Sequence, residues 1–172
     1  MKKIIFTFLV GGVLSMNAFA FEMKSPVLAN GGYIPDRYTC DGENISPEIS
    51  WADAPKKTVS LALICDDPDA PFGTWTHWVL YNIPSSISTL PEGSSKGGEL
   101  KDGILQGIND FGEIGFGGPC PPAGKAHRYF FRLYALDIIL KLDKGAPRKY
   151  VEKAMVGHIL AEAGIHGLYQ RK

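Results

Sequence analysis

The chain has 172 residues, and its 18 lysine and arginine residues balance its 18 aspartate and glutamate residues, so the formal net charge is zero. This length matches one ordinary domain with a sizeable core, and the sequence contains no internal repeat or low-complexity tract. The charge balance gives little support for nucleic-acid binding, because phosphate-backbone binding needs a basic face.

The first 20 residues are predicted to be a cleaved signal peptide. Lys2 and Lys3 form a basic start, residues 4–16 are an apolar run too short to span a bilayer, and residues 18–20 (AFA) form a small-x-small cleavage site. Cleavage removes both lysines and leaves a domain of residues 21–172 with 16 basic and 18 acidic residues. We therefore expect a periplasmic protein with no membrane span.

Three apolar segments predict the central strands of a mainly β fold. Residues 59–65 (VSLALIC) form a continuous apolar run, which is typical of a strand buried on both faces. Residues 75–83 (WTHWVLYNI) and 129–136 (YFFRLYAL) are rich in aromatic residues. The 12 prolines and 20 glycines separate short apolar runs, as they do in β-rich proteins.

The remaining elements are a glycine-rich stretch and a helix. Nine of the 26 residues in 93–118 are glycine, and each interior glycine costs a helix roughly 1 kcal/mol relative to alanine. We expect a loop there, with a short strand at residues 104–107. Residues 147–163 have apolar side chains at helical spacing with Gly164 as a stop, and residues 167–170 predict a last edge strand.

Ionisable side chains gather at the edges of the predicted strands. Because side chains alternate along a strand, Asp67 and Asp69 face the same way, and His127 and Tyr129 face the same way. His77 lies in the predicted strand of residues 75–83, which comes between these two pairs along the chain. Such groups are costly to bury unpaired, so they should pair with each other or line a concavity that accepts a charged ligand.

Each of these motifs also has a purely structural interpretation. The sequence Asp67-Pro68-Asp69 is common in turns, and His127 fits a solvated strand start. Alternation places His77 on one face with Trp75 and Val79, and its position between two tryptophans also fits a core histidine. The pocket interpretation therefore depends on the joint pattern.

Three cysteines in an exported chain indicate one disulfide and one free thiol. Cys65 ends an apolar strand, where a free cysteine acts as a small hydrophobic side chain. Cys40 and Cys120 lie in turn-rich segments and are the favoured pair. Sequence alone does not fix the connectivity.

Four motifs follow one another along nearly all of the predicted mature chain: residues 40–51 (CDGENISPEISW), 67–71 (DPDAP), 76–78 (THW) and 115–129 (GFGGPCPPAGKAHRY). Together they resemble the phosphatidylethanolamine-binding protein family, specifically its bacterial Raf-kinase-inhibitor-like branch. The resemblance implies an antiparallel β-sandwich of two sheets, with one or two peripheral helices and a small anion pocket at one end.

The resemblance also implies site residues. The pocket positions of the family match Asp67, Asp69, His77, His127 and Tyr129. The rim of the pocket would be a loop that includes Gly118, Pro119, Pro121 and Pro122, and the peptide bond between Ala70 and Pro71 would be cis. The chain ends soon after its predicted helix, without the longer C-terminal segment of animal members, which puts any link to kinase regulation in doubt.

These residues predict a protein that binds a small anion such as phosphate or phosphoethanolamine, and that regulates or inhibits a partner protein. Protonated imidazoles and the Tyr129 hydroxyl would donate hydrogen bonds to the anion. The two aspartates would orient the imidazoles and raise their pKa, which favours binding on the acidic side of neutral. No cofactor is expected, and bacterial relatives suggest a homodimer.

Two other function classes are compatible with the same residues. A hydrolase could use an Asp/His acid-base pair, but the sequence has no G-x-S-x-G motif and no serine beside these histidines. A metal could instead be bound by two histidines and a carboxylate, namely His77 and His127 with Asp67 or Asp69. Their spacing matches no known metal motif. We therefore expect neither an enzyme nor a metal site.

Overall fold

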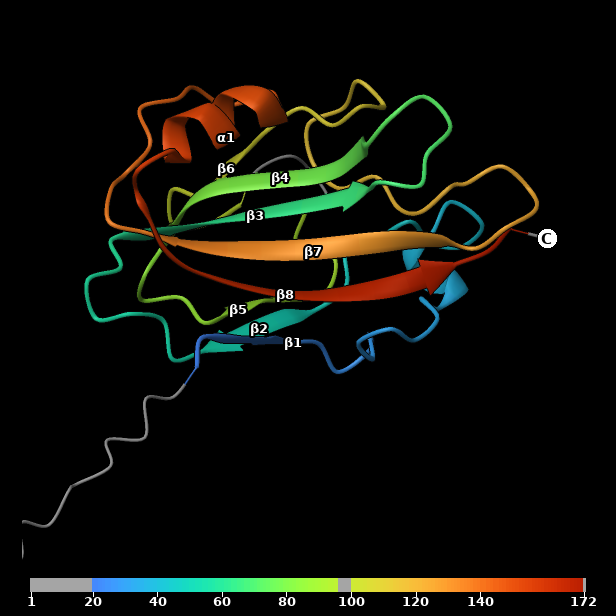
Figure 1. Cartoon of the computed structure of the whole chain (residues 1–172), viewed down its shortest axis with the longest axis horizontal. Coiled ribbons are helices and arrows are strands. Elements are labelled where there is room, and N and C mark those ends of the chain that lie inside the picture. The colour runs from blue at the N-terminus through green and yellow to red at the C-terminus, as the bar shows by residue number, and fades with distance from the viewer. Residues whose placement is uncertain (1–19, 96–99, 172) are drawn as a thin grey trace, which may run out of the picture.

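The structure, a computed structural model, describes residues 20–95 and 100–171, and the predicted signal peptide lies almost entirely outside the described residues. In this part of the chain, two antiparallel sheets and one α-helix form the fold (Figure 1). The elements in chain order are β1 (Glu22–Lys24), the 3-10 helix η1 (Asp36–Tyr38), β2 (Ile49–Ala52), β3 (Ser60–Asp67), β4 (Trp75–Pro84), β5 (Thr89–Leu90), β6 (Leu105–Gln106), β7 (His127–Leu136), α1 (Arg148–Met155) and β8 (Ile159–Tyr169).

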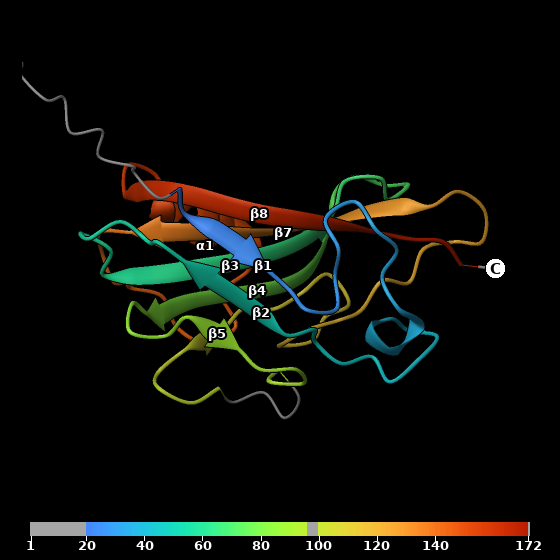
Figure 2. The ribbon, with the colours of Figure 1, turned by 90° about the horizontal axis from the view of Figure 1, so that it is seen from below.

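The two sheets and the helix form three layers. The large sheet has the strand order β6-β4-β3-β7-β8, and the small sheet has the order β1-β2-β5 and covers one of its faces (Figure 2). The core between the sheets includes Trp51 from β2 and Leu63 and Phe131 from the large sheet. A second core on the opposite face holds Ile64 of β3 against Val151 of α1. The predicted antiparallel β-sandwich with a peripheral helix is confirmed.

The three predicted central strands are present with small changes in their ends. Every residue of β3 is buried, as expected for a strand covered on both faces. The predicted short strand at residues 104–107 corresponds to β6, which pairs with β4. The described peptide bonds include no cis bond, so the cis bond that we expected before Pro71 is wrong.

The C-terminal prediction is wrong in its boundaries. The helix ends at Met155 and not near Gly164, and Gly157, with φ +82°, follows its C-cap in the left-handed conformation that favours glycine. The chain then enters β8, which pairs with the whole of β7 and includes most of the predicted edge strand. Pairing with β7 overrides the helical spacing of the apolar residues in 159–163.

No helix in the described part of the chain is both long and apolar enough to cross a membrane.

Candidate functional site

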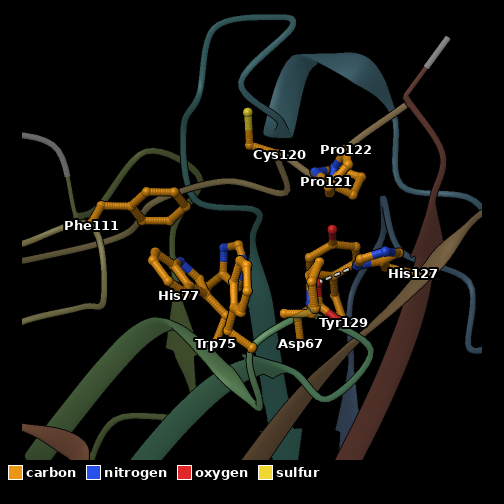
Figure 3. Close-up of a pocket in the computed structure, with 12 residues that line it drawn as sticks. Asp67, Trp75, His77, Phe111, Cys120, Pro121, Pro122, His127 and Tyr129 are labelled. Atoms are coloured by element: carbon orange, nitrogen blue, oxygen red, sulfur yellow. Dashed lines mark hydrogen bonds and ion pairs between the residues drawn. The ribbon is translucent and has the colours of Figure 1, made fainter. Parts of the chain in front are cut away.

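A small pocket lies where β3 ends and where β4 and β7 begin (Figure 3). Its volume is about 210 Å³. Of the residues predicted for the pocket and its rim, six line it: Asp67, His77, Pro121, Pro122, His127 and Tyr129. Residues from three strands and from the loop before β7 therefore meet at one end of the large sheet.

A β-bulge brings His77 to the pocket. Successive residues of β3 pair with Trp78 and then with Thr76, so the pairing skips His77. A bulge changes the direction of the side chains beyond it. Trp75 and His77 both line the pocket, whereas Val79 packs in the core beneath α1. The predicted shared face of His77 and Val79 is therefore wrong, because strict alternation does not hold across the bulge.

Asp67 fixes the orientation of the His127 ring. The Nδ1 atom of His127 lies 2.7 Å from Oδ2 of Asp67, and the side chains are only 12% and 4% exposed (Figure 3). A carboxylate only accepts hydrogen bonds, so Nδ1–H is the donor. The other oxygen of Asp67 accepts the backbone N–H of Asp69 at 2.8 Å. Nε2 is thereby the nitrogen of His127 that remains for a ligand.

Asp69 holds an arginine and does not orient an imidazole. Its carboxylate accepts hydrogen bonds from Nε and Nη2 of Arg128, at 2.8 and 2.6 Å, and from the Arg128 backbone N–H at 2.9 Å. The side-chain hydrogen bonds from Arg128 lower the pKa of Asp69 to about 2. Asp69 is not among the pocket-lining residues, and it ties the loop after β3 to the start of β7.

His77 is a neutral imidazole in this site. Its Nδ1 atom lies 2.6 Å from the backbone oxygen of Gly117, and a carbonyl only accepts, so Nδ1–H is the donor. Burial lowers the pKa of His77 below its usual value, because desolvation disfavours the charged form. Nε2 of the neutral ring then carries a lone pair and accepts hydrogen bonds. This differs from the charged donor that the sequence predicted.

The Tyr129 hydroxyl is a buried donor with no partner. The residue is completely buried, and its oxygen has no hydrogen-bond partner among the described residues. Burial, then the negative charge of Asp67 and an approach of the hydroxyl to the Asp67 carboxylate, raises the pKa of Tyr129, so the group stays protonated. This approach does not have the geometry of a hydrogen bond, so the donor stays unpaired among the described residues. Nε1 of Trp75 is also buried without a described partner. Leaving such groups unpaired costs stability, and in native proteins they often mark the place of a ligand or water.

The loop of residues 115–122 forms one wall of the pocket and is tied to the segment before β2. Cys40 and Cys120 lie at disulfide distance with Cα atoms 5.4 Å apart, and the Cys40 N–H donates to the Pro119 oxygen at 3.1 Å. The Gly118 N–H donates to Oδ1 of Asn44 at 2.7 Å. Gly118 and Pro119 thus support the rim from behind and do not line the pocket.

The pocket residues that the sequence analysis missed include two phenylalanines. Phe72 and Phe111 line the pocket, and both follow turn-forming sequences in loops. The side chain of Asn109 accepts the backbone N–H of Phe111 at 3.0 Å, as asparagine does in turns. The sequence signal was an aromatic residue directly after each turn motif, DAP before Phe72 and ND before Phe111.

No group of three or more histidine, cysteine, aspartate or glutamate side chains in the described residues is arranged to hold a metal ion. Asp67 already receives the hydrogen bond of His127, and His77 is turned toward the Gly117 carbonyl. The structure therefore does not bring His77, His127 and a carboxylate together as a set of three metal ligands.

Comparisons with known proteins give a consistent result. A family model described as "Phosphatidylethanolamine-binding protein" matches residues 24–170. The chain is 56% identical over 150 residues to a UPF0098 protein of Methanothermobacter thermautotrophicus, which covers 87% of this chain and 99% of the relative. It is 54% identical over 161 residues to a UPF0098 protein of Aquifex aeolicus, with 92% of this chain and 94% of the relative covered.

Solved structures agree with these relatives. Escherichia coli YbcL, described as a new member of the mammalian PEBP family, superposes with a TM-score of 0.84 at 34% identity, over 90% of this chain and 100% of YbcL. CT736 from Chlamydia trachomatis, described as a putative homologue of the same family, gives a TM-score of 0.81 at 39% identity, over 89% and 99% of the two chains. This chain therefore belongs to the phosphatidylethanolamine-binding protein family.

Proposed function

We propose that this chain binds a small anion, phosphate or a phosphorylated head group such as phosphoethanolamine, in the pocket between β3, β4 and β7. The family's ligand-binding fold supports a binding protein. The observation that carries the proposal is the Tyr129 hydroxyl, a buried and protonated donor without a described partner in the pocket wall. An anion oxygen that accepts from this hydroxyl removes the cost of the unpaired group.

The neighbouring groups suit the same ligand. Nε2 of His127 belongs to a ring whose orientation is fixed by Asp67, and it donates to an anion when the ring carries a second proton. Nε1 of Trp75 supplies an N–H in the same pocket. Hydrogen bonds to a charged phosphate are stronger than neutral ones. Nε2 of neutral His77 accepts a hydrogen bond, so it suits the P–OH group of a monoprotonated phosphate. The lowered pKa of His77 also means that this imidazole does not contribute to tighter binding in mild acid.

The pocket supports binding better than hydrolysis. The described residues that line it include no serine or threonine, and its cysteine, Cys120, is paired with Cys40. The Asp67–His127 pair could act on a water molecule, and this keeps a hydrolase as the second candidate. A panel of esterase and phosphatase substrates tests it, and turnover that His127→Ala abolishes would support the hydrolase.

We also propose that the chain is exported and that the mature form begins at Phe21, after the AFA site. The pairing of Cys40 with Cys120 supports export, because disulfides persist in oxidising compartments such as the periplasm. N-terminal sequencing of the protein from the periplasmic fraction tests this. A chain that keeps residues 4–16 would contradict it. We further propose that the chain regulates a partner protein and that it forms a homodimer. Analytical ultracentrifugation tests the homodimer by measuring the mass in solution.

Calorimetric titration of the protein with inorganic phosphate and with phosphoethanolamine tests the binding proposal. His127→Ala should weaken binding roughly tenfold to hundredfold, because it removes one hydrogen bond to a charged group. His158→Ala is the matched control, since His158 also pairs with an aspartate, Asp137, at 2.8 Å, but outside the pocket. Equal affinities for both variants would place the anion elsewhere. A large loss of thermal stability in His127→Ala alone would show that His127 has a structural role.

A further inference from the structure

Aromatic rings line a large part of the pocket beside its polar groups. The ring centroids of Tyr129 and His77 lie 5.1 Å apart, those of His77 and Phe111 lie 5.3 Å apart, and those of Phe111 and Trp75 lie 5.5 Å apart, all edge to face. Figure 3 shows Tyr129 beside the Asp67–His127 pair and Phe111 on the other side of His77. The pocket therefore has a polar half at His127 and an aromatic half at Phe111.

The position of Phe111 is determined by its surroundings. A Cβ atom on Gly117 would lie 2.5 Å from the Phe111 ring, so this close approach requires glycine. The Asn109 side chain holds both ends of the turn, because it accepts from the backbone N–H of Phe111 and donates to the Gly115 oxygen, each at 3.0 Å. Phe111 nevertheless stays 44% exposed. Phe111 therefore lines the pocket while part of its apolar surface stays uncovered.

Phe72 adds a second open ring at the mouth of the pocket. It lies in the turn closed by the hydrogen bond from the Gly73 N–H to the Ala70 oxygen, at 3.2 Å. Its side chain lines the pocket and is fully exposed, so no described residue covers it. Large apolar side chains in a ligand pocket usually contact an apolar part of the ligand.

The size and charge of the pocket agree with such a ligand. A cavity of roughly 150 Å³ is enough to accommodate benzene, and this pocket has about 210 Å³. Asp67 is the carboxylate among the described lining residues, and it already accepts hydrogen bonds from His127 and from the backbone of Asp69. The ammonium group of phosphoethanolamine would therefore have to share this one carboxylate with His127 and the Asp69 N–H.

We propose that the pocket prefers a phosphomonoester whose ester group is aromatic or compactly apolar. The phosphate would lie at Tyr129 and His127, and the apolar group would lie against Phe111 and Phe72. This inference depends on the proposed anion site and adds the class of ligand to it. It assigns Phe72 and Phe111 as residues that determine specificity.

Calorimetric titrations with phenyl phosphate, phosphoethanolamine and inorganic phosphate test the inference. The parent protein should bind phenyl phosphate about tenfold more tightly than phosphoethanolamine, because the ring buries apolar surface. Phe72→Ala should weaken phenyl phosphate binding about threefold to tenfold and leave the inorganic phosphate affinity unchanged. The fold should persist, since Phe72 is fully exposed. Val156→Ala, at a residue 74% exposed at the end of α1, is the control and should change neither affinity.

The outcomes separate this inference from the proposed function. If all three ligands bind the parent protein equally well, the aromatic half has no role and the inference is overturned, while the anion site stands. If Phe72→Ala weakens inorganic phosphate as much as phenyl phosphate, Phe72 does not determine specificity and the inference is again overturned. If none of the three ligands binds to the folded protein, the anion site itself is refuted.

Discussion

Replacing Tyr129 with phenylalanine should move ligand affinity and protein stability in different directions. The substitution removes one oxygen atom and keeps the ring, which is completely buried between the sheets. The hydroxyl has no described partner, so the unliganded protein should lose no stability and could gain about 1 kcal/mol. The complex, in contrast, should lose a hydrogen bond to an anion, about 1.5 to 3 kcal/mol, which is roughly a tenfold to 150-fold weaker affinity.

Tyr81 provides the matched control for this prediction. It is also completely buried, but it packs in the other core, and its hydroxyl donates to the Asp143 oxygen and accepts from the Ala146 N–H. Tyr81→Phe should therefore destabilise the protein by about 0.5 to 1.5 kcal/mol and leave the ligand affinity unchanged.

Urea unfolding and calorimetric titration with inorganic phosphate, on the parent protein and both variants, measure the two effects. If Tyr129→Phe destabilises the protein as much as Tyr81→Phe does, the Tyr129 hydroxyl has a partner within the protein. If its phosphate affinity is unchanged, the hydroxyl does not contact the ligand. Either result would refute the reasoning.

The remaining predictions concern the rim, the response to acid and a buried ion pair. Cys40→Ser should lower the free energy of unfolding by roughly 4 kcal/mol, because its bond with Cys120 closes a loop of 80 residues; three free thiols in the native protein, counted by mass spectrometry after alkylation, would contradict the pairing. His77→Gln should reduce the loss of stability in mild acid. Burial lowers the pKa of His77, so below the ordinary value of 6.5 the unfolded chain binds a proton that the folded chain does not, and the free energy of unfolding falls with pH. If this free energy falls equally steeply from about pH 7 to 5 in the parent and the variant, His77 is not the cause. Asp66→Asn should lower the free energy of unfolding in urea by about 3 kcal/mol, because the Asp66 side chain is 1% exposed and pairs with Arg132 and Arg148. It should leave the phosphate affinity unchanged.

The regular strands could be predicted because their sequence patterns are local. The run before Asp66 is apolar except for Ser60, which is typical of a strand covered on both faces, and β3 is buried throughout. The end of the chain could not be predicted in the same way. Residues 159–163 suit both helical and strand spacing, and the partner that decides between them, β7, lies more than 20 residues earlier. The stop signal was Gly157 and not Gly164.

In the site, too, local patterns predicted the residues on regular strands but not those whose positions depend on distant segments. Tyr129 lies on a regular strand, so alternation placed it correctly beside His127, and both line the pocket. His77 lies at a bulge, which alternation does not describe and which depends on the register with β3. The role of Asp69 depends on its hydrogen bonds with Arg128, which lies 59 residues later in the chain, and no local pattern predicts that pairing. The unpaired Tyr129 hydroxyl follows from packing between distant segments, and no local pattern predicts it.

The most direct test of the anion site is a crystal structure of the protein grown with inorganic phosphate or phosphoethanolamine. The account predicts phosphate density in the pocket, with one oxygen within about 3 Å of the Tyr129 hydroxyl and another at the same distance from Nε2 of His127. Phosphate bound elsewhere, or a pocket in which a protein group or a water molecule pairs with the Tyr129 hydroxyl while the anion is excluded, would contradict it.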